Sequence, residues 1–352
     1  MGSLCTSDDN VNLLIPGIPD DLAMLCLVRL ARKYHHILRG VCKRWRSFIS
    51  SDLFVSLRTK HGFSEGWIYV LSRDVSECLH WHVLDPCARQ WMKLPPIPSA
   101  WSKRFGMSST VLDRRFYLIG GCGKFESPTN EVHIFDALHH KWKTVASMDF
   151  ARCFLVSATL DGKVYAIGGT GVMSGALSSW EVYDPHTDQW ESNEDQNIVQ
   201  DVGESMVMDG KIHVRHVSPP YGLSFYASTY DPSRKTWMLV DDEMTRTWHG
   251  PAVVVGNDTY MLDQIFGIKL LVFDKANGFW DLVGRISPRS ISVPCRMAVV
   301  GSTIFIIGKG LKTLVLDTNQ IHKATGLLMT SSIVGSEFLQ NNIVMSCNTI
   351  YI

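Results

Sequence analysis

The 352-residue sequence lacks long hydrophobic runs, cysteine motifs and net charge. No stretch of about 18 apolar residues could span a bilayer, and the N-terminus has no hydrophobic signal-peptide core. The nine cysteines stand singly, without the Cys-x-x-Cys or Cys/His spacing of a zinc site. Equal numbers of basic and acidic residues, 34 each, argue against steering by nucleic-acid phosphates. We therefore expect a protein of the cytoplasm or nucleus that binds neither metal nor nucleic acid.

The charge that is present is unevenly distributed. Residues 1–60 hold nine Lys/Arg against five Asp/Glu, whereas the remaining chain holds 25 against 29. A small basic head and a mildly acidic body indicate two modules with different partners. The apolar content of 45% is sufficient for a buried core.

The first twelve residues predict a disordered leader. Met1-Gly2 followed by Thr6 also fits the loose myristoylation pattern, and Cys5 could take a second acyl chain. That pattern is short and degenerate, so an unmodified leader is the alternative. We expect membrane binding only if Gly2 is acylated.

An internal repeat fills the chain after the head, in the form of Asp followed six positions later by Trp. Successive Trp residues are 51, 48, 47 and 43 positions apart, and Asp317 marks a sixth unit with Lys323 at the Trp position. This period is that of a propeller blade of four strands. The pairs are Asp85/Trp91, Asp136/Trp142, Asp184/Trp190, Asp231/Trp237 and Asp274/Trp280, in expected units 66–98, 104–148, 152–195, 202–244, 249–288 and 293–330.

Each unit reads as four strands in succession. A tight turn such as Leu160–Lys163 closes the first hairpin, because Gly accepts a positive φ there. Asp, in three units followed by Pro, makes the turn between the third and fourth strands, and the Trp supplies a surface that can pack against the neighbouring sheet. Double glycines at the end of a second strand let backbones approach near a crowded channel. These glycines are Gly120-Gly121 and Gly168-Gly169.

The first unit begins at Gly66–Leu71 with what reads as a second strand, so its first strand is missing. The C-terminal segment 333–352 is strand-like, and we expect it to pair into the first blade and seal the exposed edge. The sequence thus predicts an all-β propeller over residues 61–352, with six blades closed by the C-terminal strand or strands.

The head, residues 13–60, predicts a small all-α domain of three helices. Pro19–Leu22 opens the first helix, and Ser51-Asp52 caps the short third one. A second helix is expected from His36 to Ser50, with Leu38, Val41, Trp45 and Phe48 on one face.

About 50 residues bury a small core, and the segment Leu22–Val28 is apolar all round. Part of the head should therefore face a partner. The alternative is a helical pedestal packed on the propeller.

The segments Ile15–Leu22 and Leu38–Ser47 closely resemble the F-box, and the tandem double Gly and Asp-Pro-x-x-x-x-Trp motifs resemble the kelch repeat. Their order resembles a large plant family of F-box/kelch-repeat proteins. The resemblance implies that the head docks on the Skp adaptor of a cullin-RING (SCF) ubiquitin ligase. It also implies that the propeller holds a target protein for ubiquitination and degradation, without catalytic residues or a cofactor of its own. The matching positions, facing the adaptor or forming the F-box core, are Ile18, Pro19, Leu22, Leu25, Val41 and Trp45.

Loops that lead into the expected first strands carry several arginines. Arg suits bidentate capture of carboxylates, so these loops could form a ring on one face for an acidic protein segment. Solvated or blade-bracing arginines are the alternative. The candidates are Arg104, Arg152, Arg246 with Trp248, and Arg289.

Two other classes of function stay open at this point. One is a kelch-propeller metalloenzyme, which needs ligands converging from several blades, whereas the histidine pairs 80/82, 139/140 and 213/216 lie on or beside expected strands. The other is a scaffold protein without ligase function.

Overall fold

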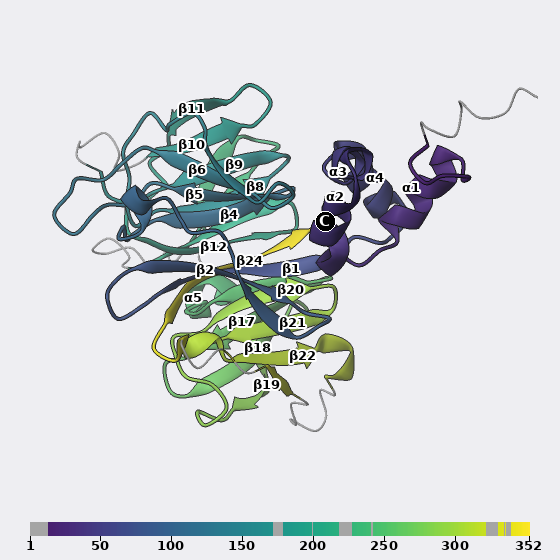
Figure 1. Cartoon of the computed structure of the whole chain (residues 1–352). Coiled ribbons are helices and arrows are strands. Elements are labelled where there is room, and N and C mark those ends of the chain that lie inside the picture. The colour runs from purple at the N-terminus through teal and green to yellow at the C-terminus, as the bar shows by residue number, and fades with distance from the viewer. Residues whose placement is uncertain are drawn as a thin grey trace, which may run out of the picture. The chain divides into compact units, whose positions relative to one another are not determined.

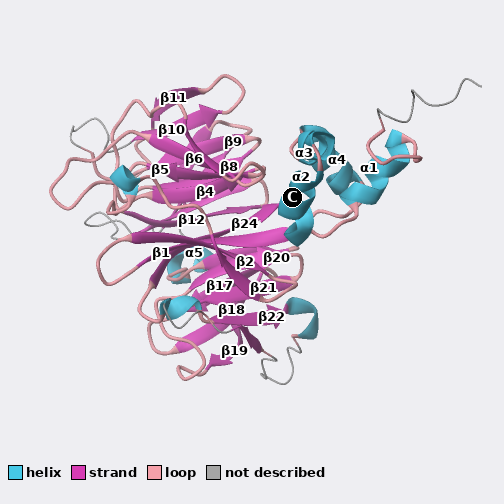
Figure 2. Ribbon diagram, viewed as in Figure 1, coloured by secondary structure: helices cyan, strands magenta, loops and turns pink. Residues whose placement is uncertain are grey.

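The computed structural model describes residues 13–171, 179–198, 200–217, 227–240, 242–321, 330–333, 335 and 339–352. The expected leader, with Gly2 and Cys5, lies outside the described residues. The chain divides into two compact units, residues 1–66 with 351–352, and residues 67–350. Figure 2 shows helices (cyan) concentrated in the first unit and strands (magenta) in the second.

The head contains four α-helices among its described residues, where the sequence predicted three. The expected second helix is interrupted at Cys42, whose backbone is extended (φ −157°, ψ 168°) and whose Sγ accepts the Trp45 N–H at 3.4 Å. Cys42 thus ends one helix and caps the next. The elements are α1 (Asp20–Val28), a 3-10 turn (Arg32–Tyr34), α2 (His35–Val41), α3 (Lys43–Ile49) and α4 (Asp52–Lys60).

The core of the head surrounds a buried arginine. Arg58 donates through Nη1 to the carbonyls of Val28 at 2.6 Å and Leu30 at 2.7 Å, and its Nη2 lies 3.0 Å from the Glu65 carboxylate. The guanidinium therefore neutralises a nearby charge and satisfies carbonyls at the end of α1. Buried side chains around it are Leu27, Val28, Phe48, Ile49 and Phe54.

The second unit is a propeller of six four-stranded antiparallel sheets (Figure 1). Blades 1 to 3 are β24 (Ile343–Tyr351), β1 (Gly66–Arg73), β2 (Leu79–Asp85) and β3 (Gln90–Lys93); β4 (Ser108–Leu112), β5 (Arg115–Ile119), β6 (Val132–Asp136) and β7 (Lys141–Thr144); β8 (Val156–Leu160), β9 (Lys163–Ile167), β10 (Ser179–Asp184) and β11 (Gln189–Glu194).

Blades 4 to 6 follow the same order, with a short helix between the fourth and fifth. They are β12 (Val202–Met208), β13 (Lys211–His216), β14 (Ala227–Asp231) and β15 (Thr236–Val240); after α5 (Glu243–Thr247), β16 (Ala252–Val255), β17 (Asp258–Asp263), β18 (Ile268–Asp274) and β19 (Phe279–Ile286); and β20 (Arg296–Val300), β21 (Thr303–Ile307), β22 (Thr313–Asp317) and β23 (Ser331–Ile333).

The C-terminal strand closes the ring, as the sequence predicted. β24 pairs with β1 and supplies the innermost strand that the first blade lacks, and Figure 1 shows it (yellow) beside β1. Its Thr349 hydroxyl donates to the Val299 carbonyl of blade 6 at 2.8 Å, and Asn348 donates to Ser109 of blade 2 at 3.3 Å. Residues 334 and 336–338 of the expected closing segment lie outside the described residues.

The repeated Asp has the role that the sequence assigned to it. In all six blades its carboxylate accepts the N–H two residues on, at 2.8 to 3.0 Å. This contact fixes the turn between the third and fourth strands.

The repeated Trp residues differ in how deeply they are buried. Only Trp237 among the five is fully buried, and its ring centroid lies 5.9 Å from that of Trp180 in the preceding blade. The loop after blade 3 lies against Trp237, since Asn197 Nδ2 donates to its carbonyl at 2.9 Å. The half-buried ones are Trp91, Trp142, Trp190 and Trp280. All five stand on the outermost strand of their blades.

The half-buried Trp residues still contact the preceding blade around the ring. Trp91 packs on a cluster that includes blade 6, and Trp142 lies 5.9 Å from Trp81 of blade 1 between ring centroids. Trp190 donates through Nε1 to the Ala146 carbonyl at 2.8 Å, just after blade 2. Trp280 packs on the methionine-rich cluster between blades 4 and 5. The repeated Trp thus joins neighbouring blades, although it is only half-buried in four of five cases.

A regular cross-strand pair explains why the spacing of six positions between Asp and Trp is the same in five blades. The residue before the Asp lies directly opposite the Trp on the next strand, for example Phe135 opposite Trp142. In four blades this residue is aromatic, and the ring centroids are 5.2 to 5.3 Å apart. Such pairs stabilise a hairpin by about 0.5–1.5 kcal/mol each beyond their buried area.

The first double glycine is required by close packing. Gly120 has φ +64°, and a Cβ at this position would lie 2.4 Å from the Arg152 carbonyl oxygen. Gly162, in the turn between β8 and β9, has φ +72° but no atom within 4 Å of its Cβ position. The two glycines thus share a backbone conformation, but only Gly162 has room for a Cβ atom.

We predict that Gly162→Ala costs about 1 kcal/mol of propeller stability, from the left-handed backbone alone. Gly120→Ala should cost at least about 2 kcal/mol more, because the methyl group meets a backbone carbonyl. Urea unfolding followed by tryptophan fluorescence measures both. Equal losses for the two variants would show that crowding at Gly120 is relieved without cost.

Candidate functional site

Three helices of the head expose large apolar side chains, and α4 does so through Leu53. Leu22 on α1 is 51% exposed, and Ile37 and Val41 on α2 are 57% and 58% exposed. Ile37 and Val41 are four residues apart, so they share one face of α2. Exposed apolar side chains grouped on a helix face are typical of a protein interaction site.

The structure separates the predicted F-box residues into surface and core. Pro19, Leu22 and Val41 are exposed and Ile18 is half-buried. Leu25 and Trp45 pack on the head core, and Trp45 Nε1 donates to the Leu14 carbonyl at 2.7 Å.

Val41 was expected on one face with Leu38 and Trp45, and this was wrong. Val41 is the last residue of α2 before the interruption at Cys42, and its side chain is exposed, whereas Leu38 and Trp45 pack on the head core.

A buried histidine stiffens the same unit. The His35 ring lies edge-on to Phe54 with centroids 5.0 Å apart, and its Nε2 is 3.2 Å from the Leu30 carbonyl oxygen. Burial, with the nearby Arg58 guanidinium, lowers the pKa of His35 to about 3. His35 is therefore neutral in the folded head at physiological pH.

The large exposed apolar residues in the described loops of the propeller lie on one face. In antiparallel blades the loops between second and third strands share a face with the loops between blades, and we call this the loop face. The turns within the other two hairpins lie on the opposite face, and no described residue of those turns is a large exposed apolar one. The apolar loop residues, between 49% and 93% exposed, are Val75, Phe125, Phe154, Val217, Ile265, Phe266 and Val293.

The expected ring of basic loop residues is only partly present. Arg152 is fully buried and pairs with Glu181, with Nε 3.0 Å and Nη2 2.9 Å from the carboxylate oxygen Oε1. It also donates to the Gly168 carbonyl at 3.0 Å, so it braces the propeller interior and cannot contact a target. Glu181 lies on a third strand 29 positions later, which is why the loop sequence alone did not reveal this partner.

Trp248 is likewise buried, with Nε1 donating to the Gly250 carbonyl at 2.9 Å, which corrects its assignment to a binding surface. Arg246 and Arg289 are exposed. Arg104 lies 4.8 Å from the centre of the Trp101 ring and 3.6 Å from the Glu131 carboxylate, and is largely covered.

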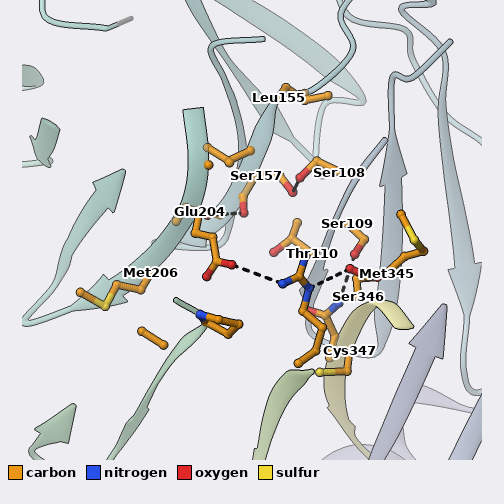
Figure 3. Close-up of a pocket in the computed structure, with 18 of the residues that line it drawn as sticks. Ser108, Ser109, Thr110, Leu155, Ser157, Glu204, Met206, Met345, Ser346 and Cys347 are labelled. Carbon is orange, nitrogen blue, oxygen red and sulfur yellow. Dashed lines mark hydrogen bonds and ion pairs between the residues drawn. The ribbon is translucent and has the colours of Figure 1, made fainter. Parts of the chain in front are cut away.

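The innermost strands of the propeller line a cavity of about 390 Å³ (Figure 3). Glu204 of β12 lies 3.5 Å from Arg296 of β20, which also donates through Nε to the Met345 carbonyl of β24 at 3.1 Å. Burial raises the pKa of the Glu204 carboxyl, against the opposing effect of Arg296 and Arg215. Sequence reasoning missed this group, because its members come from different blades and no local spacing connects them.

The histidine pairs of the sequence make local contacts. His80 lies 2.7 Å from Asp74, and His139 lies 3.0 Å from Asp136. Within the described residues there is no group of three or more His, Cys, Asp or Glu side chains that could hold a metal ion. None of the described helices is both long and apolar enough to cross a membrane.

Known protein families match both units. Residues 15–57 match the model of the F-box domain, and residues 68–287 match that of the FKB95 Kelch-repeats domain. F-box/kelch-repeat protein SKIP4 of Arabidopsis thaliana is 38% identical over 332 residues, which cover 93% of this chain and 91% of that protein.

The chain belongs to the F-box/kelch-repeat family. A second relative, described as a putative F-box/kelch-repeat protein of Arabidopsis thaliana, is 29% identical over 322 residues, which cover 87% of this chain and 90% of that protein. The family and fold expected from the sequence are therefore confirmed, an F-box head followed by a six-bladed kelch propeller.

We predict that acid weakens the F-box through His35. The pKa in the folded state, about 3, is below the ordinary 6.5, so between these values the unfolded state binds more protons. The stabilisation is complete above pH 6.5 and is lost as the pH falls, by about 2 kcal/mol at pH 5. Hydrogen exchange of the α4 amides in the full chain measures it at pH 7 and pH 5.

His35→Gln keeps a donor for the Leu30 carbonyl and does not titrate, so it serves as the control. Its α4 amides should show a smaller loss of protection on acidification than those of the original protein. The same loss in both proteins would assign the pH dependence to other groups.

Proposed function

We propose that this F-box/kelch-repeat protein is the substrate-recognition subunit of an SCF ubiquitin ligase. The F-box docks on a Skp-family adaptor, and through it on a cullin-RING ligase, while the propeller binds a target protein for ubiquitination. In this role the chain positions a target and contributes no catalytic residue. The observation that carries the proposal is the exposure of apolar side chains on α1 and α2 within the matched F-box.

The head offers the adaptor a defined set of side chains. We propose that Pro19, Leu22 and Val41 contact the adaptor, joined by Ile37, which sequence reasoning had not singled out. Leu25 and Trp45 act indirectly, since they pack on the head core and hold α1 and α3 in place. Substitution of Trp45 would therefore disturb the fold as well as the surface.

Leu22→Asp should weaken adaptor binding by at least about 30-fold, because a charge would replace an exposed apolar contact residue in a desolvated interface. Leu53→Asp is the matched control, since Leu53 on α4 is 52% exposed and is not one of the F-box positions named in the sequence analysis. Calorimetric titration with a purified Skp adaptor measures both. Undiminished affinity of Leu22→Asp, with the helices intact by circular dichroism, contradicts the proposed docking.

The loop face is the proposed site for the target. Its exposed apolar residues come from several blades. Two exposed arginines lie in the connections between blades, Arg246 on α5 and Arg289 in a loop. Loops vary freely on a rigid sheet scaffold, which makes such a face suited to selective binding. The combination favours a target segment with large apolar side chains and acidic neighbours.

Replacing both Phe125 and Phe266 with Asp should abolish target capture while leaving adaptor binding unchanged. The matched control is Phe279→Asp, at a residue that is 46% exposed on the outer strand β19 and lies off the loop face. Proximity labelling with an F-box-deleted chain compares the proteins captured by each variant. Targets that persist with the double variant, or vanish equally with the control, contradict this assignment.

A further inference from the structure

The charged residues of the central cavity lie toward the loop-face end of the channel. Innermost strands begin at the inter-blade loops, and Glu204 and Arg296 stand near the starts of β12 and β20. Arg215 lies near the end of β13, directly opposite Glu204 in the strand register. All three groups therefore meet near the same mouth of the channel, and Arg296 retains 38% of its side-chain exposure there.

The charges at this mouth are not balanced. Arg296 pairs with Glu204, which also attracts Arg215, so two guanidinium groups share one carboxylate. The buried Nε of Arg215 has no hydrogen-bond partner among the described residues. It lies against the cavity wall, since a Cβ on the lining residue Gly203 would come within 2.6 Å of its Nη2. Buried polar groups are nearly always satisfied, so the unsatisfied Nε–H of Arg215, together with the excess of one positive charge, points to a missing anionic partner.

Hydroxyl groups complete the lining. Ser108 and Ser157 bond each other at 2.7 Å, and Ser205 donates to the Ser157 carbonyl at 2.9 Å. The Oγ of Ser346 is buried and has no partner among the described residues. Figure 3 shows Ser346 and Glu204 at the same cavity. The wall thus offers a free hydroxyl and a carboxylate acceptor to the hydroxyl groups of a ligand.

We propose that the channel mouth binds a small hydroxylated organic acid, with its carboxylate at Arg215 and Arg296 and its hydroxyls at Glu204 and Ser346. Two guanidinium groups against one carboxylate select a single negative charge, and Glu204 disfavours a multiply charged phosphate. A cavity of about 390 Å³ is within the range of small-molecule sites. The site needs only the propeller, so it does not rest on the proposed ligase role.

The same carboxylate chemistry could come from an acidic side chain of a bound protein. Calorimetry on the full chain distinguishes the sources with four probes. These are D-gluconate (carboxylate and hydroxyls), sorbitol (hydroxyls alone), sulfate (charge alone) and N-acetyl-aspartate methylamide (a protein-like carboxylate). We expect gluconate to bind below about 1 mM and the other three at least about tenfold more weakly. Tighter binding of the blocked aspartate, or no heat with gluconate, overturns the proposal.

Arg215→Met should reduce gluconate affinity by at least about tenfold, as expected for loss of a charged hydrogen-bond partner. Arg285→Met, at an exposed arginine on β19, is the matched control and should bind as the original protein does. Ser346→Ala, a smaller change, should weaken gluconate several-fold and tests the site if Arg215→Met does not fold. Unchanged affinity in a folded Arg215→Met or in Ser346→Ala contradicts the assignment.

Discussion

The pairing of β24 with β1 is the constraint on which the propeller depends. The first blade obtains its innermost strand from the opposite end of the chain, so no blade is left with an open inner edge. β24 also bonds side chains or carbonyls of blades 2 and 6, which makes it the joint between the beginning and the end of the ring. A closed ring holds all its loops at fixed mutual distances, as a binding face on loops requires.

Within this ring, polar and apolar groups serve different faces. The Asp turns support all six sheets, and cross-strand pairs that include a Trp support five of them. Among the described turns and loops, large exposed apolar residues occur only in loops of one face. Arg152 shows how a basic loop residue can belong to the scaffold, because its charge is matched by a buried carboxylate. Arg215 is the contrasting case, because it shares the Glu204 carboxylate with Arg296 and its Nε has no hydrogen-bond partner among the described residues.

The sequence predicted much of this architecture, because local chemistry repeats along it. Asp turns, the spacing to Trp and the missing first strand sufficed for six blades and their closure. What it could not show depends on contacts between distant positions, such as Glu181 beside Arg152 or Glu204 beside Arg296. The sequence did not predict the helix break at Cys42, because the hydrophobic spacing from Leu38 to Phe48 fits one continuous helix. Only the backbone shows that α2 ends and α3 begins there.

The sequence also could not predict how deeply each repeated Trp is buried. The motif is the same at Trp190 and Trp237, yet one is half-buried and the other fully buried. The difference comes from what lies over the outer strand of each blade, which the residues of the motif do not encode. A repeat therefore predicts the strand on which a side chain stands better than it predicts how far that side chain is covered.

The most direct test of ring closure is hydrogen exchange of the β24 amides in the intact protein. If β24 is the innermost strand of blade 1, its protected amides should exchange as slowly as those of β4 and β8, through unfolding of the whole propeller. Exchange of β24 within seconds, as for a frayed terminus, while β4 and β8 stay protected, would contradict the closure and with it the fixed loop face.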